Sequence, residues 1–123
     1  MTTATVMDAD SLRRTPDAPR LFEGADHGVT GLSFFLVDAA PGQGPALHLH
    51  PYAEVFVVHE GRATFRVGDE VTEAGAGQIV IAPPGQPHRF TNSGPGRLRM
   101  VTLHPAGRTD TTWLEEKPPA PAA

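Results

Sequence analysis

Histidine and glutamate side chains at close spacing are the residues of this sequence best suited to chemistry. His48 and His50 are separated by one residue, Glu54 follows four residues later, and His88 lies further along the chain. Three imidazoles and one carboxylate form a ligand set for a divalent transition metal, with Fe, Mn, Ni, Zn and Cu as candidates. Because the chain contains no cysteine, thiolate ligands and disulfide bonds are excluded.

The identity of the metal depends on how many coordination positions the protein leaves open. Four protein ligands would saturate a structural zinc ion, which is usually four-coordinate. Iron(II) or manganese prefers about six ligands and would keep about two positions for substrate or dioxygen. We favour iron or manganese, while nickel, copper and zinc stay open.

The spacing of the ligands favours a β-strand over a helix. Side chains two residues apart lie on the same face of a strand, so His48 and His50 project together, and Glu54 has the same parity. On a helix the two histidines would diverge, and Pro51 would break it. We expect Pro51 to distort the strand before Glu54. His88 must arrive through tertiary folding, aided by the Pro-Pro-Gly turn just before it.

The size and composition indicate one domain. A chain of 123 residues fits a single domain with a modest core. The net charge of −4, with scattered basic residues, argues against nucleic-acid binding. No apolar run approaches transmembrane length, and no secretory signal is evident. We therefore expect a cytoplasmic protein that binds neither nucleic acid nor membrane.

Short apolar runs alternate with turn residues from residue 20 onwards. This spacing is typical of an all-β sandwich or barrel, and no long run has the period of a helix. Strands are expected at about Arg20–Phe22, Val29–Asp38, Ala46–His50, Glu54–His59, Ala63–Val67, Glu70–Glu73, Gln78–Ala82, Pro87–Asn92 and Leu98–His104. We predict a loose N-terminal arm (1–19), one β-barrel domain (20–108) and a C-terminal tail (109–123). The tail is expected to hold a short helix over 109–117 and a disordered Pro-rich end from residue 118.

Two spaced motifs resemble those of a known family. The motif G-x5-H-x-H-x3-E-x6-G is filled by Gly42, His48, His50, Glu54 and Gly61. The motif G-x5-P-x-G-x2-H-x3-N is filled by Gly77, Pro83, Gly85, His88 and Asn92. The sequence thus resembles a small single-domain cupin with both motifs complete. The resemblance covers residues 42–92 directly, and the strand pattern extends it to about 20–104.

The resemblance implies a small jelly-roll β-barrel that holds the metal inside, near an open mouth. Because cupins include iron-dependent dioxygenases, it implies a metalloenzyme of dioxygenase type that acts on a small, partly apolar or aromatic molecule. A Lewis-acid isomerase or cyclase is the nearest variant. A cupin that binds or senses a small molecule without turnover, a purely structural metal site, and a barrel that binds no metal are the alternatives.

Further residues share the parity of the ligands and are predicted to line the pocket. Phe56 and Phe90 are expected to form walls. Met100, Thr102 and His104 share one parity on the last expected strand and would line the mouth. A histidine at a strand end is more often a surface residue, and we favour that position for His104.

Two motif residues are predicted to serve the fold. Gly61 is expected at a hairpin tip, where a positive φ is easiest for glycine. Asn92 is expected to bridge the following turn through side-chain hydrogen bonds.

The strand edges of a small barrel require cover against uncontrolled pairing. Small cupins often dimerise, so the resemblance implies a homodimer, in which the N-terminal arm could add a strand to the sheet of its partner. The other expected partner is a small-molecule substrate or ligand.

Overall fold

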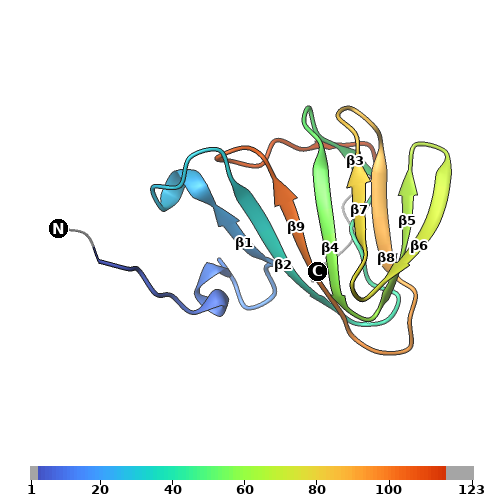
Figure 1. Ribbon diagram of the computed structural model, residues 1–123, viewed down its shortest axis with the longest axis horizontal. Helices are drawn as coiled ribbons and strands as arrows, with labels where there is room; N and C mark the ends of the chain where they lie inside the picture. Colours follow the sequence, from blue (N-terminus) through green and yellow to red (C-terminus); the bar gives the residue numbers. More distant parts are fainter. Residues whose placement is uncertain (1–2, 116–123) are drawn as a thin grey trace.

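Two antiparallel β-sheets make up the computed structural model of this protein, which describes residues 3–115 (Figure 1). The first, called sheet A, has the strand order β1-β2-β9-β4-β7. Its strands are β1 (Arg20–Glu23), β2 (Ser33–Ala39), β9 (Leu98–His104), β4 (Glu54–Glu60) and β7 (Ile79–Ala82).

The second sheet, called sheet B, has the strand order β10-β3-β8-β5-β6. Its strands are β10 (Thr112–Trp113), β3 (His48–Leu49), β8 (His88–Asn92), β5 (Arg62–Val67) and β6 (Glu70–Gly75). Two short 3₁₀ turns, η1 (Ala9–Leu12) and η2 (Gly24–Asp26), flank β1. The predicted all-β barrel of two sheets is confirmed. No helix within residues 3–115 is long and apolar enough to cross a membrane.

Most strand boundaries lie within two residues of the sequence expectation, and two regions differ more. Residues 29–32 form a turn rather than the start of β2, because Gly31 has a φ of 73°, which an extended strand does not allow. The short helix expected from residue 109 is wrong over the described residues, where Thr112–Trp113 pairs with β3 as β10. The Pro-rich end predicted from residue 118 lies outside the described residues.

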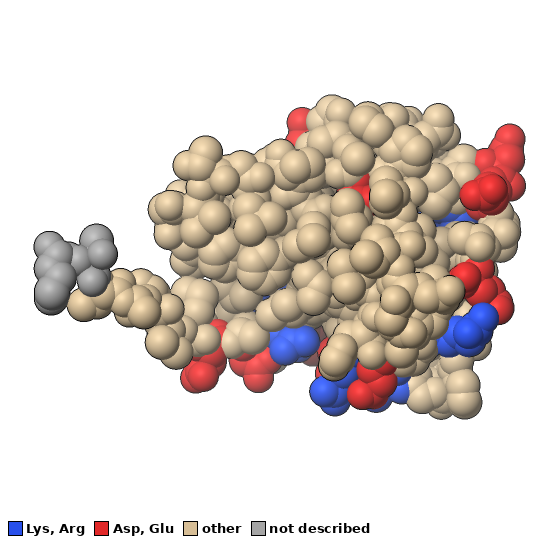
Figure 2. Space-filling model, in the orientation of Figure 1, with Lys and Arg blue, Asp and Glu red and all other residues tan. Residues whose placement is uncertain are grey.

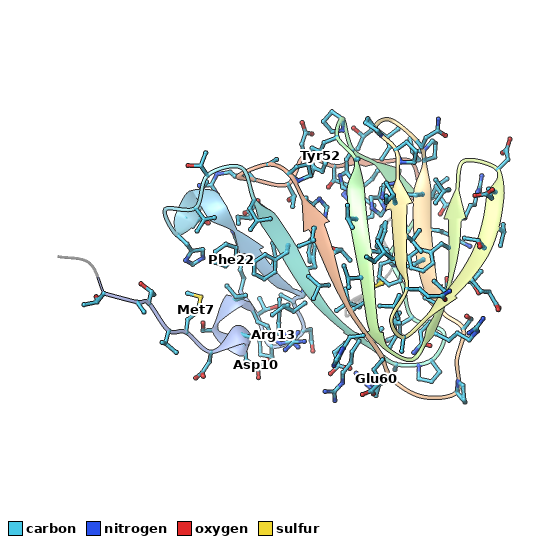
Figure 3. The ribbon with its side chains drawn as sticks, viewed as in Figure 1. Met7, Asp10, Arg13, Phe22, Tyr52 and Glu60 are labelled. Atoms are coloured by element: carbon cyan, nitrogen blue, oxygen red, sulfur yellow. The ribbon has the colours of Figure 1, made fainter. Side chains whose placement is uncertain are left out.

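The inward side chains of both sheets pack into one apolar core. Phe56 of sheet A meets Phe65 of sheet B with ring centroids 5.1 Å apart at 65°. Such edge-to-face pairs contribute about 0.5–1.5 kcal/mol beyond burial alone. The other core residues are Val37, Ala39, Val58, Ala63, Ala74, Ala82, Phe90, Leu98 and Met100. Tyr52 and Glu60 mark opposite ends of the barrel (Figure 3), and the candidate site lies at the Tyr52 end.

Glycine is required at the tip of the β4–β5 hairpin. Gly61 alone connects the two strands, with a φ of 86°. A Cβ atom there would lie 2.3 Å from the carbonyl oxygen of Arg97. Both the backbone conformation and this close approach exclude other residues, so the predicted role of Gly61 is confirmed.

Candidate metal centre

Side chains from both sheets converge at one end of the barrel. His48 on β3 and His88 on β8 are directly paired across sheet B, with ring centroids 4.5 Å apart. His50 follows β3, and Glu54 begins β4 in sheet A. All four are buried, and one ligand atom from each lies within 4.8 Å of all the others. The structure thus brings together the four predicted ligands.

The chain changes sheets between the two predicted strands that carry these residues. Strand β3 ends at Leu49, and the chain crosses from sheet B to sheet A at a bend beginning at Pro51. The N–H of Gly85 donates to the carbonyl oxygen of His50 at 2.8 Å. This hydrogen bond ties the turn before His88 to the first motif. The four side chains therefore converge because of this crossing and this turn, and not because of strand parity alone.

Backbone carbonyls hold the three histidine ligands in one tautomer. Their Nδ1 atoms lie 2.8–2.9 Å from the carbonyl oxygens of Ala46 for His48, Asp110 for His50 and Gln86 for His88. A carbonyl oxygen only accepts, so each Nδ1 carries the hydrogen of the neutral ring. Each Nε2 then presents a lone pair, which is the form in which imidazole binds a metal.

The contacts with Glu54 are suited to a cation between the groups. Oε1 of Glu54 lies 2.9 Å from Nε2 of His88 and 3.0 Å from Nε2 of His50. With hydrogen on Nδ1, these contacts join acceptor to acceptor, and such pairs repel when buried. Nε2 of His50 has no hydrogen-bond partner among the described residues. The nitrogen and oxygen donors therefore fit a divalent transition metal.

Electrostatics keep these ligands in their metal-binding forms. Burial lowers the pKa of His48 to about 4, so its ring is neutral near pH 7. Burial alone would raise the pKa of Glu54, but hydrogen-bond donors at the positions of His104, His50 and His88 outweigh that effect and lower it. A cation held by the Nε2 atoms of His50 and His88 would favour the ionised carboxylate in the same way. The carboxylate is therefore ionised.

His104 is a further buried histidine beside the four ligands. Its Nε2 lies 3.2 Å from Oε2 of Glu54, although the ring is not aligned for a full hydrogen bond. Its Nδ1 lies 2.8 Å from the hydroxyl of Tyr52, which accepts the N–H of Asp110 at 3.1 Å. The surface position favoured from the sequence is wrong, because β9 lies between β2 and β4 and His104 points into the barrel.

A cavity of about 660 Å³ opens beside the four ligands. Its apolar walls include Leu21, Phe35, Val37, Phe56, Phe90 and Trp113. The Trp113 ring lies 5.0 Å from that of His48 at an angle of 43°. Asp17 and Glu54 are the acids of the described lining, and this lining contains no lysine or arginine. The cavity thus offers mainly apolar walls to any molecule that reaches the metal centre, and Asp17 is the acid of the described lining that is not a predicted ligand.

Comparison with known proteins identifies the family. The Cupin domain family matches residues 35–104. The chain belongs to the cupin family.

Two proteins resemble this cupin in sequence, and one of them also resembles it in solved structure. Protein SchB of Streptomyces halstedii is 31% identical over 116 residues, or 88% of this chain and 84% of SchB. The crystal structure of an uncharacterised Klebsiella pneumoniae protein with a double-stranded beta-helix domain is 28% identical, with a TM-score of 0.71. That alignment covers 93% of this chain and 100% of the other.

A more distant likeness shows the fold alone. A variant of Bacillus subtilis oxalate decarboxylase has a TM-score of 0.70 at 20% identity. The alignment covers 76% of this cupin and 27% of the decarboxylase chain.

The remaining predicted site residues fall into two groups. Phe56, Phe90, Thr102 and His104 line the cavity of this cupin. Met100 does not, because it lies deeper in β9, paired with Val37 and Val58 within the core. The side chain of Met100 does point into the barrel, as predicted, but it lies in the core below the cavity.

Sequence reasoning missed Tyr52, Asp110 and Trp113. Tyr52 stacks on His50 with ring centroids 5.1 Å apart at 4°. Asp110 serves the site through its backbone, which leaves no signal in a side-chain pattern. An aromatic residue two positions after a ligand, as Tyr52 is, was the one available signal.

Proposed function

We propose that this cupin binds one divalent transition metal ion through His48, His50, Glu54 and His88. One observation carries the proposal. The Nδ1 atoms of three buried imidazoles hydrogen-bond to backbone carbonyls, so their Nε2 lone pairs lie close to one another and to the carboxylate of Glu54. Protons cannot replace the metal at His48 near neutral pH, because burial lowers its pKa to about 4. The donor set accommodates iron, manganese, nickel, zinc or copper.

Iron(II) or manganese is the proposed ion. Four protein ligands leave about two positions of an octahedral ion for a ligand from the cavity, whereas a structural zinc site would be complete. The presence of a cavity of about 660 Å³ directly beside the ligands supports an accessible ion. The decarboxylase that shares the fold has Mn(II) centres.

The substrate is proposed to be a small, uncharged, largely apolar or aromatic molecule with a metal-binding oxygen. Phe35, Phe56, Phe90 and Trp113 supply flat apolar walls, which suit a ring system. A substrate carboxylate would find no lysine or arginine in the described lining, and Asp17 would repel it. A dianion such as oxalate would therefore find no cationic side chain in the described lining besides the metal itself.

The proposed activity is a metal-dependent reaction of dioxygenase type, with a Lewis-acid isomerase or cyclase as its nearest variant. The metal would supply redox or Lewis-acid chemistry at the substrate oxygen. The apolar walls would orient the substrate and exclude water, while backbone carbonyls keep the ligand rings fixed. The second candidate is a cupin that binds the same molecule without turnover. A cytoplasmic location stays a prediction from the sequence.

One experiment separates these functions. The protein is loaded with Fe(II) without oxygen, mixed with a panel of neutral aromatic and keto compounds, and then exposed to air. Dioxygen uptake coupled to product supports the dioxygenase, and product without uptake supports the isomerase or cyclase. Saturable binding without product supports the non-catalytic cupin. The His88→Ala variant is the control for turnover by free iron. Failure of every compound to bind, with the metal in place, would contradict the proposed ligand class.

A further inference from the structure

Three buried side-chain atoms of the described residues have no hydrogen-bond partner. They are Nε2 of His50, Nε2 of His104 and Oγ1 of Thr102. The two nitrogens lie 3.0 and 3.2 Å from carboxylate oxygens of Glu54, so they belong to the metal centre. The Thr102 hydroxyl has no such contact, although Thr102 is only 2% exposed. Because a buried hydroxyl without a partner is unfavourable, this group needs a separate explanation.

The position of Thr102 on β9 directs its side chain into the cavity. Thr102 is paired with Phe35 of β2 on one side and with Phe56 of β4 on the other. All three residues line the cavity. Residues paired between neighbouring strands lie side by side on one face, so two phenylalanine rings flank the hydroxyl, and these side chains carry no oxygen or nitrogen that could bond to it. The fold thus leaves the hydroxyl to a molecule that enters the cavity.

The two phenylalanines that flank Thr102 also contact the metal centre. The ring of Phe35 lies 5.6 Å from that of His104, and the ring of Phe56 lies 5.9 Å from that of His88. His104 follows Thr102 by two residues on the same face of β9, which separates them by about 7 Å along the strand. One molecule between these walls can therefore reach the metal at one end and the Thr102 hydroxyl at the other.

We propose that Thr102 determines substrate specificity by hydrogen bonding to a second polar group of the molecule that binds the metal. This inference rests on the proposed function and narrows its ligand class. The ligand is a neutral aromatic molecule with a metal-binding oxygen on one side and a hydroxyl or carbonyl group across the ring. A threonine hydroxyl both donates and accepts, so it pairs with either group.

The charge around the site favours an uncharged second group. The described lining of the cavity contains no lysine or arginine. On the face shown in Figure 2, most basic side chains lie in the lower half of the molecule, toward its Glu60 end, whereas the site lies at the Tyr52 end (Figure 3). A carboxylate against Thr102 would therefore be buried between phenylalanine rings without a cationic side chain beside it, which is unfavourable.

The Thr102 hydroxyl should have opposite effects on the empty and the occupied barrel. Valine has nearly the shape of threonine, so Thr102→Val removes the hydroxyl and little else. Without an organic ligand, this variant should unfold at the same urea concentration as the wild type or at a higher one, because it removes an unpaired buried group. With a ligand that carries the second polar group, the same change should lower affinity.

The test compares matched neutral chelators on the Co(II)-loaded full chain, whose visible absorption reports binding at the metal. Allomaltol is compared with kojic acid, and salicylamide with its ring-hydroxylated derivatives, so that each comparison adds one hydroxyl. At least one hydroxylated compound should bind the wild type about 10-fold more tightly than its parent, since a site with a buried polar group rejects molecules that leave it unpaired. Thr102→Val should lose this preference, and Thr102→Ser should retain it.

Thr64→Val is the matched control. Thr64 lies on β5 between the core residues Ala63 and Phe65, so its side chain points away from the barrel interior, and this variant should keep the preference. A preference that survives in Thr102→Val, or a wild type that binds the parent compounds as tightly as the hydroxylated ones, would overturn the role of Thr102. A lowered urea midpoint of ligand-free Thr102→Val would also overturn it, because the hydroxyl would then already serve the fold.

Failure of the proposed function gives a different result. If no compound, parent or hydroxylated, alters the Co(II) spectrum, the ligand class proposed for the metal centre is wrong. The urea midpoints of the ligand-free proteins then decide whether the Thr102 hydroxyl is unpartnered, since they do not depend on any ligand.

Discussion

His104 lies against the oxygen of Glu54 that the other histidines leave open. Its Nε2 is 3.2 Å from Oε2, whereas His50 and His88 lie near Oε1. The hydroxyl of Tyr52 accepts a backbone N–H, which leaves its own hydrogen for Nδ1 of His104. The imidazole hydrogen of His104 is then on Nε2, facing the carboxylate. His104 thereby differs from the three ligands and orients Glu54.

Replacing His104 should therefore weaken metal binding without removing a ligand. In His104→Ala the buried Oε2 loses its neighbour, and metal affinity should fall about 10–100-fold. His104→Gln, which can restore an N–H donor, should recover part of the loss. Competition of Co(II) or Zn(II) with a chromogenic chelator measures both, and His59→Ala, an exposed position on β4, is the control. Wild-type affinity in His104→Ala would show that His104 does not act on Glu54.

The Tyr52→Phe variant should separate the contribution of the Tyr52 hydroxyl to stability from that of its ring. Burial raises the pKa of Tyr52, so its hydroxyl keeps its hydrogen at neutral pH. The phenylalanine ring preserves stacking on His50 but leaves Nδ1 of buried His104 without its partner. Loss of this hydrogen bond should cost about 1–3 kcal/mol in the free energy of unfolding. Urea denaturation gives the value, and an unchanged midpoint and slope would contradict the contact.

Asn92 bridges the β8–β9 turn, as its place in the second motif predicts. Its Nδ2 donates to the carbonyl oxygens of Ala39 (3.0 Å) and Gly96 (2.8 Å), and its Oδ1 accepts the N–H of Gly94 (3.0 Å). Asn92→Ala should lower the free energy of unfolding by about 2–4 kcal/mol, since it deletes three hydrogen bonds and leaves buried groups unpaired. Thermal and urea unfolding measure the loss. Metal affinity at a temperature where the variant is folded should stay within about threefold of wild type, and a larger loss would place Asn92 in the metal site.

The metal-free protein should lose stability as the pH falls from about 6.5 to 4. The pKa of His48 is about 4 in the folded protein against an ordinary 6.5, so over this window the unfolded chain binds the extra proton. Stability therefore rises with pH across the window, by at most about 3 kcal/mol from this residue. Urea titrations at several pH values test the slope, which His48→Gln should reduce. A pH-independent free energy of unfolding would contradict the buried neutral ring.

Local sequence patterns predicted those parts of the fold and site that depend on local chemistry. Alternating runs marked the strands, and β9 begins and ends at the predicted residues. The residue types, their spacing and the match to both cupin motifs selected the four side chains that converge. The turn rich in proline and glycine before His88 was expected to direct the chain toward the site.

The rest depends on contacts between distant segments. A strand of two residues such as β10 has no periodicity, so its pairing with β3 could not be recognised. His104 has the sequence context of a surface residue, and only the position of β9 between two strands buries it. The depth of Met100 likewise follows from packing across the barrel. The three-dimensional position of each residue decides its burial and pairing here, and strand propensity does not report that position.

The metal content of the purified protein tests the central claim most directly. Wild type, a His48→Ala/His88→Ala variant and a His27→Ala/His59→Ala control should be prepared without added metal, dialysed against equimolar divalent transition metals, and analysed by elemental mass spectrometry. We predict about one equivalent of one divalent ion in the wild type and the control, and almost none in His48→Ala/His88→Ala. Stoichiometric metal in His48→Ala/His88→Ala, or a folded wild type that retains no metal, would contradict the account.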